Sequence, residues 1–355
     1  MDSIKDTVCS FAYLYKAMTK CRKGVMWKDS VARYSNNGLA SVLKLYNSLN
    51  TDTYSIDEYH HFTIYEPKER EIVSTRFKDR VFQRSLCDNY LYDVITKSFI
   101  HDNCACQVGK GTDFAMDRLN CHMQRYFRKY GLNGYVLRCD IKNYFGSTPH
   151  QIAKKTVRRN VKDRWVLGHL ENIIDSFSSN DKPGVGMGLG SQVTQLIQLA
   201  VLDGLDHTIK EELRIKQYIR YMDDFLLIHN SKEYLRECLL QINAILEKLG
   251  LKLNTKKTQI FPLKQGIDFL GFKFKLTETG RVVRIINKEN VKKRKRKLRK
   301  LKKLVDDGKM TREKADQCYE SWKSHAKKGN SYKLLQRMDK YYASLWKEEV
   351  LCLEN

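Results

Sequence analysis

The chain has 355 residues, of which 42% are hydrophobic, so it can bury one large core or two to three smaller ones and is not a disordered chain. Its 65 Lys and Arg against 41 Asp and Glu give a formal net charge of +24, which indicates a polyanionic partner, first nucleic acid and then an acidic membrane surface. No run approaches the roughly 20 apolar residues of a membrane helix, and no export signal opens the chain, so we expect a cytoplasmic protein without a membrane partner. The ten cysteines form no CxxC pair, which favours reduced thiols over a zinc site.

The first 130 residues are predicted to be mostly helical. Residues 1–50 carry apolar side chains at helical spacing, and residues 77–130 predict further helices around the loop CACQVGKGTD. Between these stretches, HHFTIYEPKEREIVS at 60–74 predicts two short strands around a charged turn. We therefore expect a helical N-terminal part that carries one small hairpin.

Strands and helices alternate in the following 150 residues. The segment GYVLRCDIKNYF contains a strand that ends at Asp140, and IRYMDDFLLIHN predicts a strand, a tight turn with Asp223 and Asp224 at its tip, and a second strand. A further strand is expected near Ile260, followed by the hairpin-like DFLGFKFKLTETGRVVRI. Helices are expected within 149–177, from about 191 to 213 as one long helix, and at 233–249.

Two adjacent carboxylates, Asp223 and Asp224, interrupt a strand-forming run. A plain hairpin turn is the alternative interpretation, but Asp-Asp is not a favoured two-residue hairpin pair, and neighbouring carboxylates repel unless a cation lies between them. Asp140 ends its strand in a β, helix, helix, β order with this hairpin, and crossover connections bring such strands side by side. We therefore expect three carboxylates at one sheet edge, where hard oxygen ligands suit Mg²⁺ and a two-metal phosphoryl transfer.

The last 70 residues are predicted to form basic helices. Ten of the thirteen residues from Val291 to Lys303 are Lys or Arg, although a helical stripe of apolar residues is retained. A merely solvated basic helix is the alternative. Since few acids are available to pair these charges, contact with phosphate groups is favoured.

Five motifs, in order, resemble those of the reverse transcriptases over roughly residues 60–350. DIKNYF at 140 resembles the first catalytic motif, GLGSQ at 188 the motif that positions template and nucleotide, and YMDD at 221 the metal-binding hairpin. LNTKKT at 253 and FLGF at 269 resemble the next two motifs, the second being the primer grip. The resemblance implies an α+β right-hand polymerase, with N-terminal helices and fingers in 1–134, a ferredoxin-like palm in 135–283 and a basic helical thumb in 284–355.

The resemblance also implies roles for individual residues. Asp140, Asp223, Asp224 and Lys257 would be catalytic, the lysine as proton donor to the leaving pyrophosphate. The ligands of two Mg²⁺ ions, with Mn²⁺ as a substitute, would be Asp140, Ile141, Asp223 and Asp224. Substrate contacts would come from Lys68, Arg70, Phe145, Gln192 and Tyr221. The primer grip would be Phe269, Leu270, Gly271 and Phe272, and contacts to the nucleic-acid backbone would come from Lys292, Lys293, Arg294, Arg296 and Lys300.

The implied activity is that of an RNA-directed DNA polymerase, a nucleotidyltransferase that extends a DNA or RNA primer on an RNA template with deoxynucleoside triphosphates. The SQ of GLGSQ, the CACQVGKGTD loop and SWKSHAKKGNSYKL most resemble bacterial retroelement enzymes of the diversity-generating type. Defence-associated reverse transcriptases that act in antiviral immunity with a dedicated non-coding RNA are the alternative, so a structured non-coding RNA or an accessory protein is a further expected partner.

Two interpretations from other classes stay open at this point. An RNA-templated RNA polymerase also uses paired aspartates in a palm, but a bulky aromatic side chain at Phe145 disfavours a ribose 2′-hydroxyl. An RNA-binding protein with a vestigial palm is disfavoured because all three acids are present, and a relic has no physical reason to retain clustered like charges.

Overall fold

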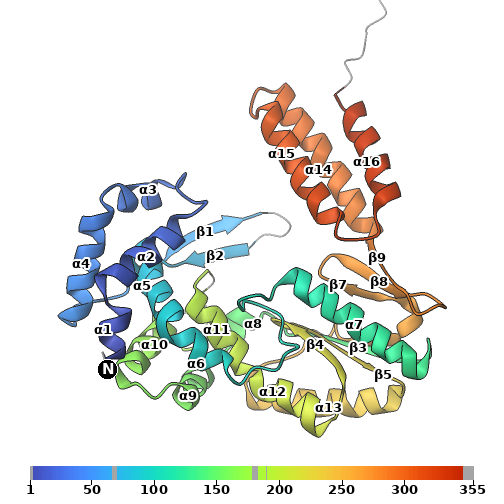
Figure 1. The fold of residues 1–355 in the computed structure, drawn as a ribbon, viewed down its shortest axis with the longest axis horizontal. Coiled ribbons are helices and arrows are strands. Elements are labelled where there is room, and N and C mark those ends of the chain that lie inside the picture. The colour runs from blue at the N-terminus through green and yellow to red at the C-terminus, as the bar shows by residue number, and fades with distance from the viewer. Residues whose placement is uncertain (1–2, 66–69, 178–182, 189, 347–355) are drawn as a thin grey trace, which may run out of the picture. The chain divides into compact units, whose positions relative to one another are not determined.

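The computed structural model describes residues 3–65, 70–177, 183–188 and 190–346, and mixes helices with small sheets (Figure 1). The chain divides into two compact units. The first contains Met1–Ala115, Leu137–Leu227 and Glu233–Gln259, and the second contains Met116–Val136, Ile228–Lys232 and Ile260–Asn355. Among the described helices, none has both the length and the apolar character that crossing a bilayer requires.

Helices and a hairpin open the first unit, as the sequence predicts. Ser3 caps the first helix, since its hydroxyl accepts from the Asp6 N–H and the Asp6 carboxylate accepts from the Ser3 N–H. The helices are α1 (Ile4–Val8), α2 (Phe11–Arg22), α3 (Asp29–Asn36) and α4 (Gly38–Asn50). The hairpin pairs β1 (His60–Ile64) with β2 (Arg70–Ser74) in antiparallel register. The predicted charged turn between these strands falls mostly on 66–69, outside the described residues.

The helical prediction for residues 77–130 is confirmed. The elements are α5 (Phe77–Leu86), the π-helical turn η1 (Cys87–Leu91), α6 (Tyr92–Thr96) and α7 (Thr112–Tyr130). The first of these helices buries Phe77, Val81, Phe82 and Leu86. These positions recur at the spacing of one helix face, so α5 contributes an apolar stripe to the core of the first unit.

A four-stranded sheet carries the acidic motifs. Its strands are β3 (Tyr135–Asp140), β4 (Gln217–Tyr221), β5 (Asp224–His229) and β6 (Gln259–Pro262), in the order β4-β5-β3-β6. This order, with helices after β3 and one helix between β5 and β6, is that of a ferredoxin-like fold. Residues Phe225–Ile228 of β5 are all buried, as expected for a strand covered on both faces. The predicted proximity of the Asp140 strand to the YMDD hairpin is confirmed.

Helices connect the strands of this sheet, and one differs from its prediction. The single helix expected from 191 to 213 ends at Val201, because Leu202 takes a non-helical conformation (ψ 3°). A second short helix then begins, and its first turn contains Asp203 and Asp206, where acidic side chains are favoured. The elements are α8 (Tyr144–Ser147), α9 (His150–Asn160), α10 (Arg164–Ser176), α11 (Gln192–Val201), α12 (Asp203–His207), η2 (Thr208–Glu212) and α13 (Lys232–Lys248).

The second unit contains a small sheet and basic helices. Its strands are β7 (Ile267–Phe269), β8 (Phe272–Leu276) and β9 (Val282–Ile286), in that order and antiparallel, after the 3-10 turn η3 (Leu263–Gln265). Its helices are α14 (Lys288–Asp306), α15 (Arg312–Ala326) and α16 (Tyr332–Ser344). Stacked rings join the last two helices, with the centroids of Tyr319 and Tyr342 4.2 Å apart. The prediction of basic C-terminal helices is confirmed.

Asp79 of α5 gives the first unit a specific dependence of stability on pH. Its carboxylate is fully buried and accepts from the Tyr54 hydroxyl at 2.7 Å and from the Asp57 N–H at 3.2 Å. Burial nonetheless raises the pKa of Asp79 to about 6. Because this folded-state pKa exceeds the unfolded value of about 3.9, the stability that this group contributes is present below pH 4 and is lost as the pH rises through 6.

We expect Asp79→Asn to reduce the loss of stability between pH 4 and pH 6.5 by about 2 kcal/mol relative to the wild type. Urea denaturation at several pH values measures this change. Asp29→Asn, at an exposed position in α3, is the matched control and should keep the wild-type slope. A slope for Asp79→Asn equal to that of the wild type would show that Asp79 does not carry this dependence.

Candidate active site

Three carboxylates come together where β3 ends and β5 begins. Asp140 is the last residue of β3 and is 6% exposed, and Asp224 is the first residue of β5. The main-chain N–H of Ile141 donates to the carbonyl of Asp223 at 3.2 Å, which ties the end of β3 to the turn. Since β3 and β5 are neighbours in the sheet, residues 83 positions apart in the sequence share one edge.

The turn between β4 and β5 lies one residue earlier than the sequence prediction. β4 ends at Tyr221 and β5 begins at Asp224, so the two connecting residues are Met222 and Asp223, not the two aspartates. Met222 has a φ of 57°, in the left-handed region that a side chain other than glycine enters only at some cost in free energy. Asp223 therefore lies at the tip, whereas Asp224 is part of the strand.

Each of two acids has its own cation. The ammonium of Lys257 lies 2.6 Å from Oδ2 of Asp140, and Nδ2 of Asn254 donates to Oδ1 at 3.2 Å. The Arg138 guanidinium donates two hydrogen bonds to the Asp224 carboxylate, from Nε at 3.2 Å and from Nη2 at 2.9 Å. Lys257 is thus placed at the site, as the sequence predicts.

Arg138 and Asn254 were missed by the sequence prediction. Arg138 could have been found, because alternate residues of a strand share a face and Arg138 lies two positions before Asp140 on β3. Asn254 stands inside the LNTKKT motif, three residues before Lys257.

The electrostatics of the acids differ. Burial raises the pKa of Asp223, and the charges of Asp140 and Asp224 raise it further. Burial also raises the pKa of Asp224, although the neighbouring Arg138 opposes this shift. Within the described residues Asp223 has no ion pair, so its carboxylate is the one whose charge is least compensated.

The side chains at this sheet edge include oxygen donors for a divalent cation. Among the residues that the structure describes, no group of three or more His, Cys, Asp or Glu side chains is arranged to hold a metal ion. Asp224 is engaged by Arg138, but Asp140 and Asp223 offer hard oxygen donors, and the ammonium against Asp140 shows that positive charge is accepted there. These two acids, with the adjacent main chain of Ile141, fit a cation that prefers oxygen ligands.

The residues predicted to contact the nucleotide lie on several elements of the first unit. Phe145 is half-buried on α8, and its carbonyl accepts from the Met187 N–H at 2.7 Å. Gln192 is the first residue of α11, which Ser191 caps, and its Oε1 is buried without a hydrogen-bond partner among the described residues. Tyr221 ends β4 and is half-buried. Each of these three residues belongs to one of the motifs, namely DIKNYF, GLGSQ and YMDD.

The remaining two predicted substrate residues, Lys68 and Arg70, belong to the stretch EPKEREI. Arg70 opens β2 opposite Ile64, and Lys68 lies outside the described residues. The predicted contact of both with the incoming triphosphate stays a prediction.

The predicted primer grip is a tight hairpin in the second unit. Leu270 and Gly271 connect β7 to β8 with φ values of 47° and 89°, the pattern of a two-residue turn with positive φ at both positions. Phe269 and Phe272, each 1% exposed, pack inward. Gly271 is exposed, and its carbonyl accepts from Nδ2 of Asn290 at 3.3 Å, so the predicted primer contact of this motif stays a prediction.

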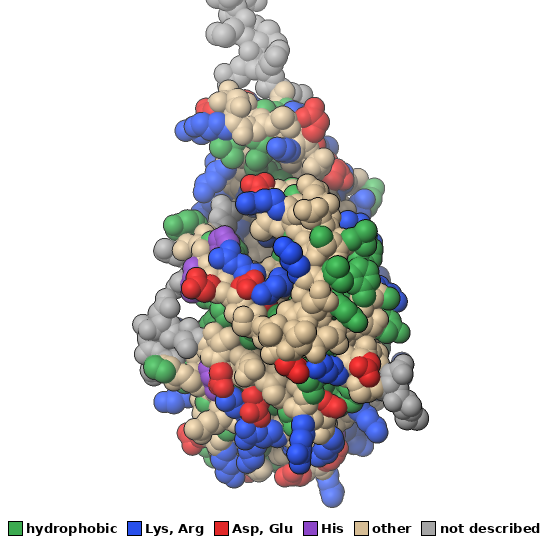
Figure 2. Space-filling model, turned by 90° about the vertical axis from the view of Figure 1, so that its left-hand side faces the viewer, with side chains coloured by type: hydrophobic (Ala, Val, Ile, Leu, Met, Phe, Trp, Pro, Cys, Tyr) green, Lys and Arg blue, Asp and Glu red, His purple; other side chains and the backbone are tan. Residues whose placement is uncertain are grey.

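The predicted backbone contacts lie on α14. Leu298 and Leu301 bury one face of this helix, which Asn287 caps. Arg294 packs over the ring of Trp322 at 5.6 Å, so it serves helix packing. The other predicted residues, Lys292, Lys293, Arg296 and Lys300, are exposed. Positive charge is not confined to this helix, since Figure 2 shows Lys and Arg side chains spread over one face of the molecule, with acidic side chains among them.

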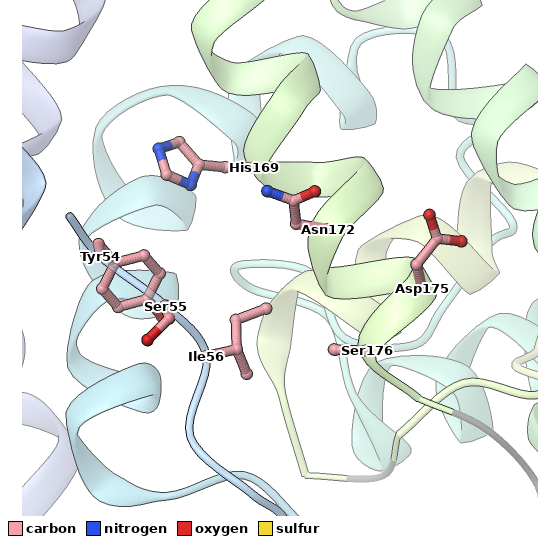
Figure 3. Close-up of a pocket in the computed structure, with 7 residues that line it drawn as sticks. All are labelled: Tyr54, Ser55, Ile56, His169, Asn172, Asp175 and Ser176. Carbon is pink, nitrogen blue, oxygen red and sulfur yellow. The ribbon is translucent and has the colours of Figure 1, made fainter. Parts of the chain in front are cut away.

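A pocket of about 410 Å³ lies elsewhere in the first unit. Figure 3 shows side chains of α10 facing the segment that precedes β1 across it. It is lined by Tyr54, Ser55, Ile56, His169, Asn172, Asp175 and Ser176. Since none of the predicted site residues lines it, this pocket is separate from the acidic site.

Comparisons with solved structures found similarity to telomerases. Telomerase from Candida albicans, in complex with a TWJ fragment of telomeric RNA, is 14% identical with a TM-score of 0.49 over 66% of this chain and 46% of that chain. Apo telomerase from Candida tropicalis, truncated from its C-terminal domain, is 13% identical with a TM-score of 0.47 over 64% and 55%. The chain thus spans about half the length of these proteins. No curated protein matched.

A comparison with protein families also found a match. The family model for reverse transcriptase (RNA-dependent DNA polymerase) matches residues 67–274, which is 208 of the 355 residues. The matched range contains β3, the YMDD hairpin and the ferredoxin-like sheet. The right-hand polymerase fold expected from the motifs is confirmed, and the chain belongs to the reverse transcriptase family of nucleotidyltransferases.

Proposed function

We propose that this protein copies an RNA template into DNA by two-metal nucleotidyl transfer as the enzyme of a bacterial retroelement. The observation that carries the proposal is the junction of Asp140 with the Met222–Asp223 turn through the Ile141 N–H. In a member of the reverse transcriptase family, two carboxylates held this way at a sheet edge can supply the hard oxygen ligands that two-metal nucleotidyl transfer needs.

The residues around the acids would divide the chemistry. Two Mg²⁺ ions, or Mn²⁺, held by Asp140, Ile141 and Asp223 with Asp224 assisting, would supply an activated attacking hydroxyl and stabilise the leaving oxygen. Lys257 holds a proton on Nζ beside Asp140, where it can be given to the leaving pyrophosphate. Arg138 of β3 holds the Asp224 carboxylate of β5 with two hydrogen bonds.

Other residues would place the substrates. Phe145 would form the wall beneath the sugar, and Oε1 of Gln192, which lacks a partner among the described residues, would accept a hydrogen bond from the nucleotide or template. Tyr221, Lys68 and Arg70 would complete the nucleotide site. The Leu270–Gly271 turn would contact the primer, and the exposed cations of α14 would contact the backbone.

In this proposal the N-terminal helices and fingers span 1–134, the palm spans 135–283 and the thumb spans 284–355. The enzyme would act in the cytoplasm on an RNA template and a DNA or RNA primer. The diversity-generating type rests on the CACQVGKGTD loop and the SWKSHAKKGNSYKL stretch. The alternative is antiviral defence with a dedicated structured RNA, because related defence enzymes share this pattern and use the same chemistry. Sequencing the nucleic acid that copurifies with the protein separates the two.

Asp223→Asn tests the proposed centre. Burial and the charges of Asp140 and Asp224 raise the pKa of Asp223 and so disfavour its ionised form, whereas a neutral amide carries no such penalty. We expect the variant to lose primer extension on oligo(dT)-primed poly(rA) with Mg²⁺ and dTTP, while its free energy of unfolding rises by about 1 kcal/mol. Wild-type protein that extends no primer, or a variant that extends at the wild-type rate, would contradict the proposal.

Phe145→Ala tests the choice of DNA over RNA synthesis. A close-packed ring resists an added hydroxyl, and overpacking typically costs about 1 to 3 kcal/mol, which corresponds to roughly 5- to 150-fold in rate. We expect the ratio of kcat/KM for deoxynucleotide over ribonucleotide to fall by a factor in this range. Phe145→Tyr retains the ring and should keep the wild-type ratio. A wild type that prefers ribonucleotides would instead indicate an RNA polymerase.

The exposed cations of α14 predict a salt-dependent interaction. We expect replacement of Lys292, Lys293, Arg296 and Lys300 by Gln to flatten the slope of log affinity against log salt by roughly one for each lost phosphate contact. The matched control removes the same charge from exposed lysines of the first unit, namely Lys16, Lys44, Lys97 and Lys248. Equal slopes for the two variants would show that α14 makes no special contact with the nucleic acid.

A further inference from the structure

Directly before the YMDD turn, β4 carries a fully buried arginine. Both Arg220 and its partner Asp206 of α12 have no exposed surface. The guanidinium donates to Asp206 from Nε at 2.7 Å and from Nη2 at 2.6 Å. The Tyr218 hydroxyl donates to the same carboxylate at 2.6 Å. The charge of Arg220 is therefore neutralised inside the core of the first unit.

The guanidinium has donors left over, and one reaches the turn. Nη2 also donates to the Leu199 carbonyl at 3.1 Å, and Nη1 donates to the Met222 carbonyl at 3.0 Å. That carbonyl belongs to the peptide unit that joins Met222 to Asp223. Because a peptide unit is planar, a hydrogen bond to its oxygen restricts the orientation of the whole unit, which includes the Cα of Asp223.

The backbone conformation of Met222 explains why the turn needs the hydrogen bond from Arg220. Its φ of 57° lies in a region that side chains other than glycine rarely occupy, so the turn persists only where surrounding contacts hold it. Arg220 is itself fixed by its main chain, since its N–H donates to the Asp102 carbonyl at 3.0 Å and its carbonyl accepts from the Cys104 N–H at 2.9 Å. The guanidinium is therefore a rigid support for the turn.

Stability alone does not account for such a pair. The desolvation of two buried charges often exceeds their attraction, and well-packed apolar side chains of similar volume can replace a buried ion pair without loss of stability. What an apolar replacement cannot supply is the hydrogen bond to the Met222 carbonyl.

We propose that Arg220 is a positioning residue, which fixes the Met222–Asp223 peptide and thereby aims the Asp223 carboxylate at the reacting groups. This inference rests on the proposed polymerase function. Arg220 touches neither substrate nor cation in this scheme. Asp206 holds the guanidinium in place, and Tyr218 holds Asp206.

The test separates positioning from folding. In the triple variant Tyr218→Phe, Asp206→Leu, Arg220→Met, apolar groups replace the whole network, so we expect a Tm at or above that of the wild type. The turn loses its support, and a misplaced catalytic group costs about 10- to 100-fold, so we expect kcat to fall by that factor while KM for dTTP stays within threefold. Arg220→Lys, which retains the charge without the fork, should fall between the triple variant and the wild type.

A second readout does not depend on activity. Amide hydrogen exchange of the peptide covering 219–225 should be at least tenfold faster in the triple variant. The matched control is Lys210→Met, which removes the ion pair of 2.7 Å to Asp102 but leaves the Met222 carbonyl bonded, and should keep wild-type exchange and kcat.

The outcomes are distinct. A triple variant that folds and has wild-type exchange and wild-type kcat would overturn the role of Arg220. The role of Arg220 would also be overturned if kcat fell only in proportion to Tm across the triple variant, Arg220→Lys and Lys210→Met. Wild-type protein that extends no primer would refute the proposed function, and the exchange rates would then still decide whether Arg220 holds the turn.

Discussion

Repulsion between three carboxylates at one sheet edge is the constraint around which this part of the chain is organised. Unpaired carboxylates that are partly removed from water cannot all stay ionised without compensation. Lys257 neutralises Asp140 and Arg138 neutralises Asp224, each within hydrogen-bond distance. Asp223 lies between them in the sequence and at the tip of the turn, with its charge least compensated. Positive charge from outside the described chain is therefore attracted most strongly to this residue.

The sheet order explains how distant residues satisfy this constraint together. In the order β4-β5-β3-β6, the strand that ends at Asp140 lies beside the strand that begins at Asp224. Asn254 and Lys257 approach from the segment before β6, where the Asn254 N–H donates to the Asp140 carbonyl at 2.7 Å. Main-chain bonds thus join the end of β3 to the turn and to the segment before β6, and side-chain motion alone does not change them.

Local pattern predicted the elements of this fold better than the contacts between them. Periodicity located the helices, the strand ending at Asp140 and the YMDD hairpin, because each depends on its own residues. It placed the turn one residue late, because Met222 enters the left-handed region only with support from Arg220, which local sequence does not show. It also assigned Phe269 and Phe272 to the primer, whereas both pack inward.

Three unfavourable features of the first unit lie in the motifs proposed to handle substrates. Asp223 has a raised pKa, Met222 has a positive φ, and Oε1 of Gln192 is buried without a described partner. Each lowers the stability of the protein by an amount that core packing elsewhere must exceed. A cation at Asp223 and a hydrogen-bond donor at Gln192 would each remove one of these penalties. Binding of substrates and ions would therefore stabilise the fold at these positions.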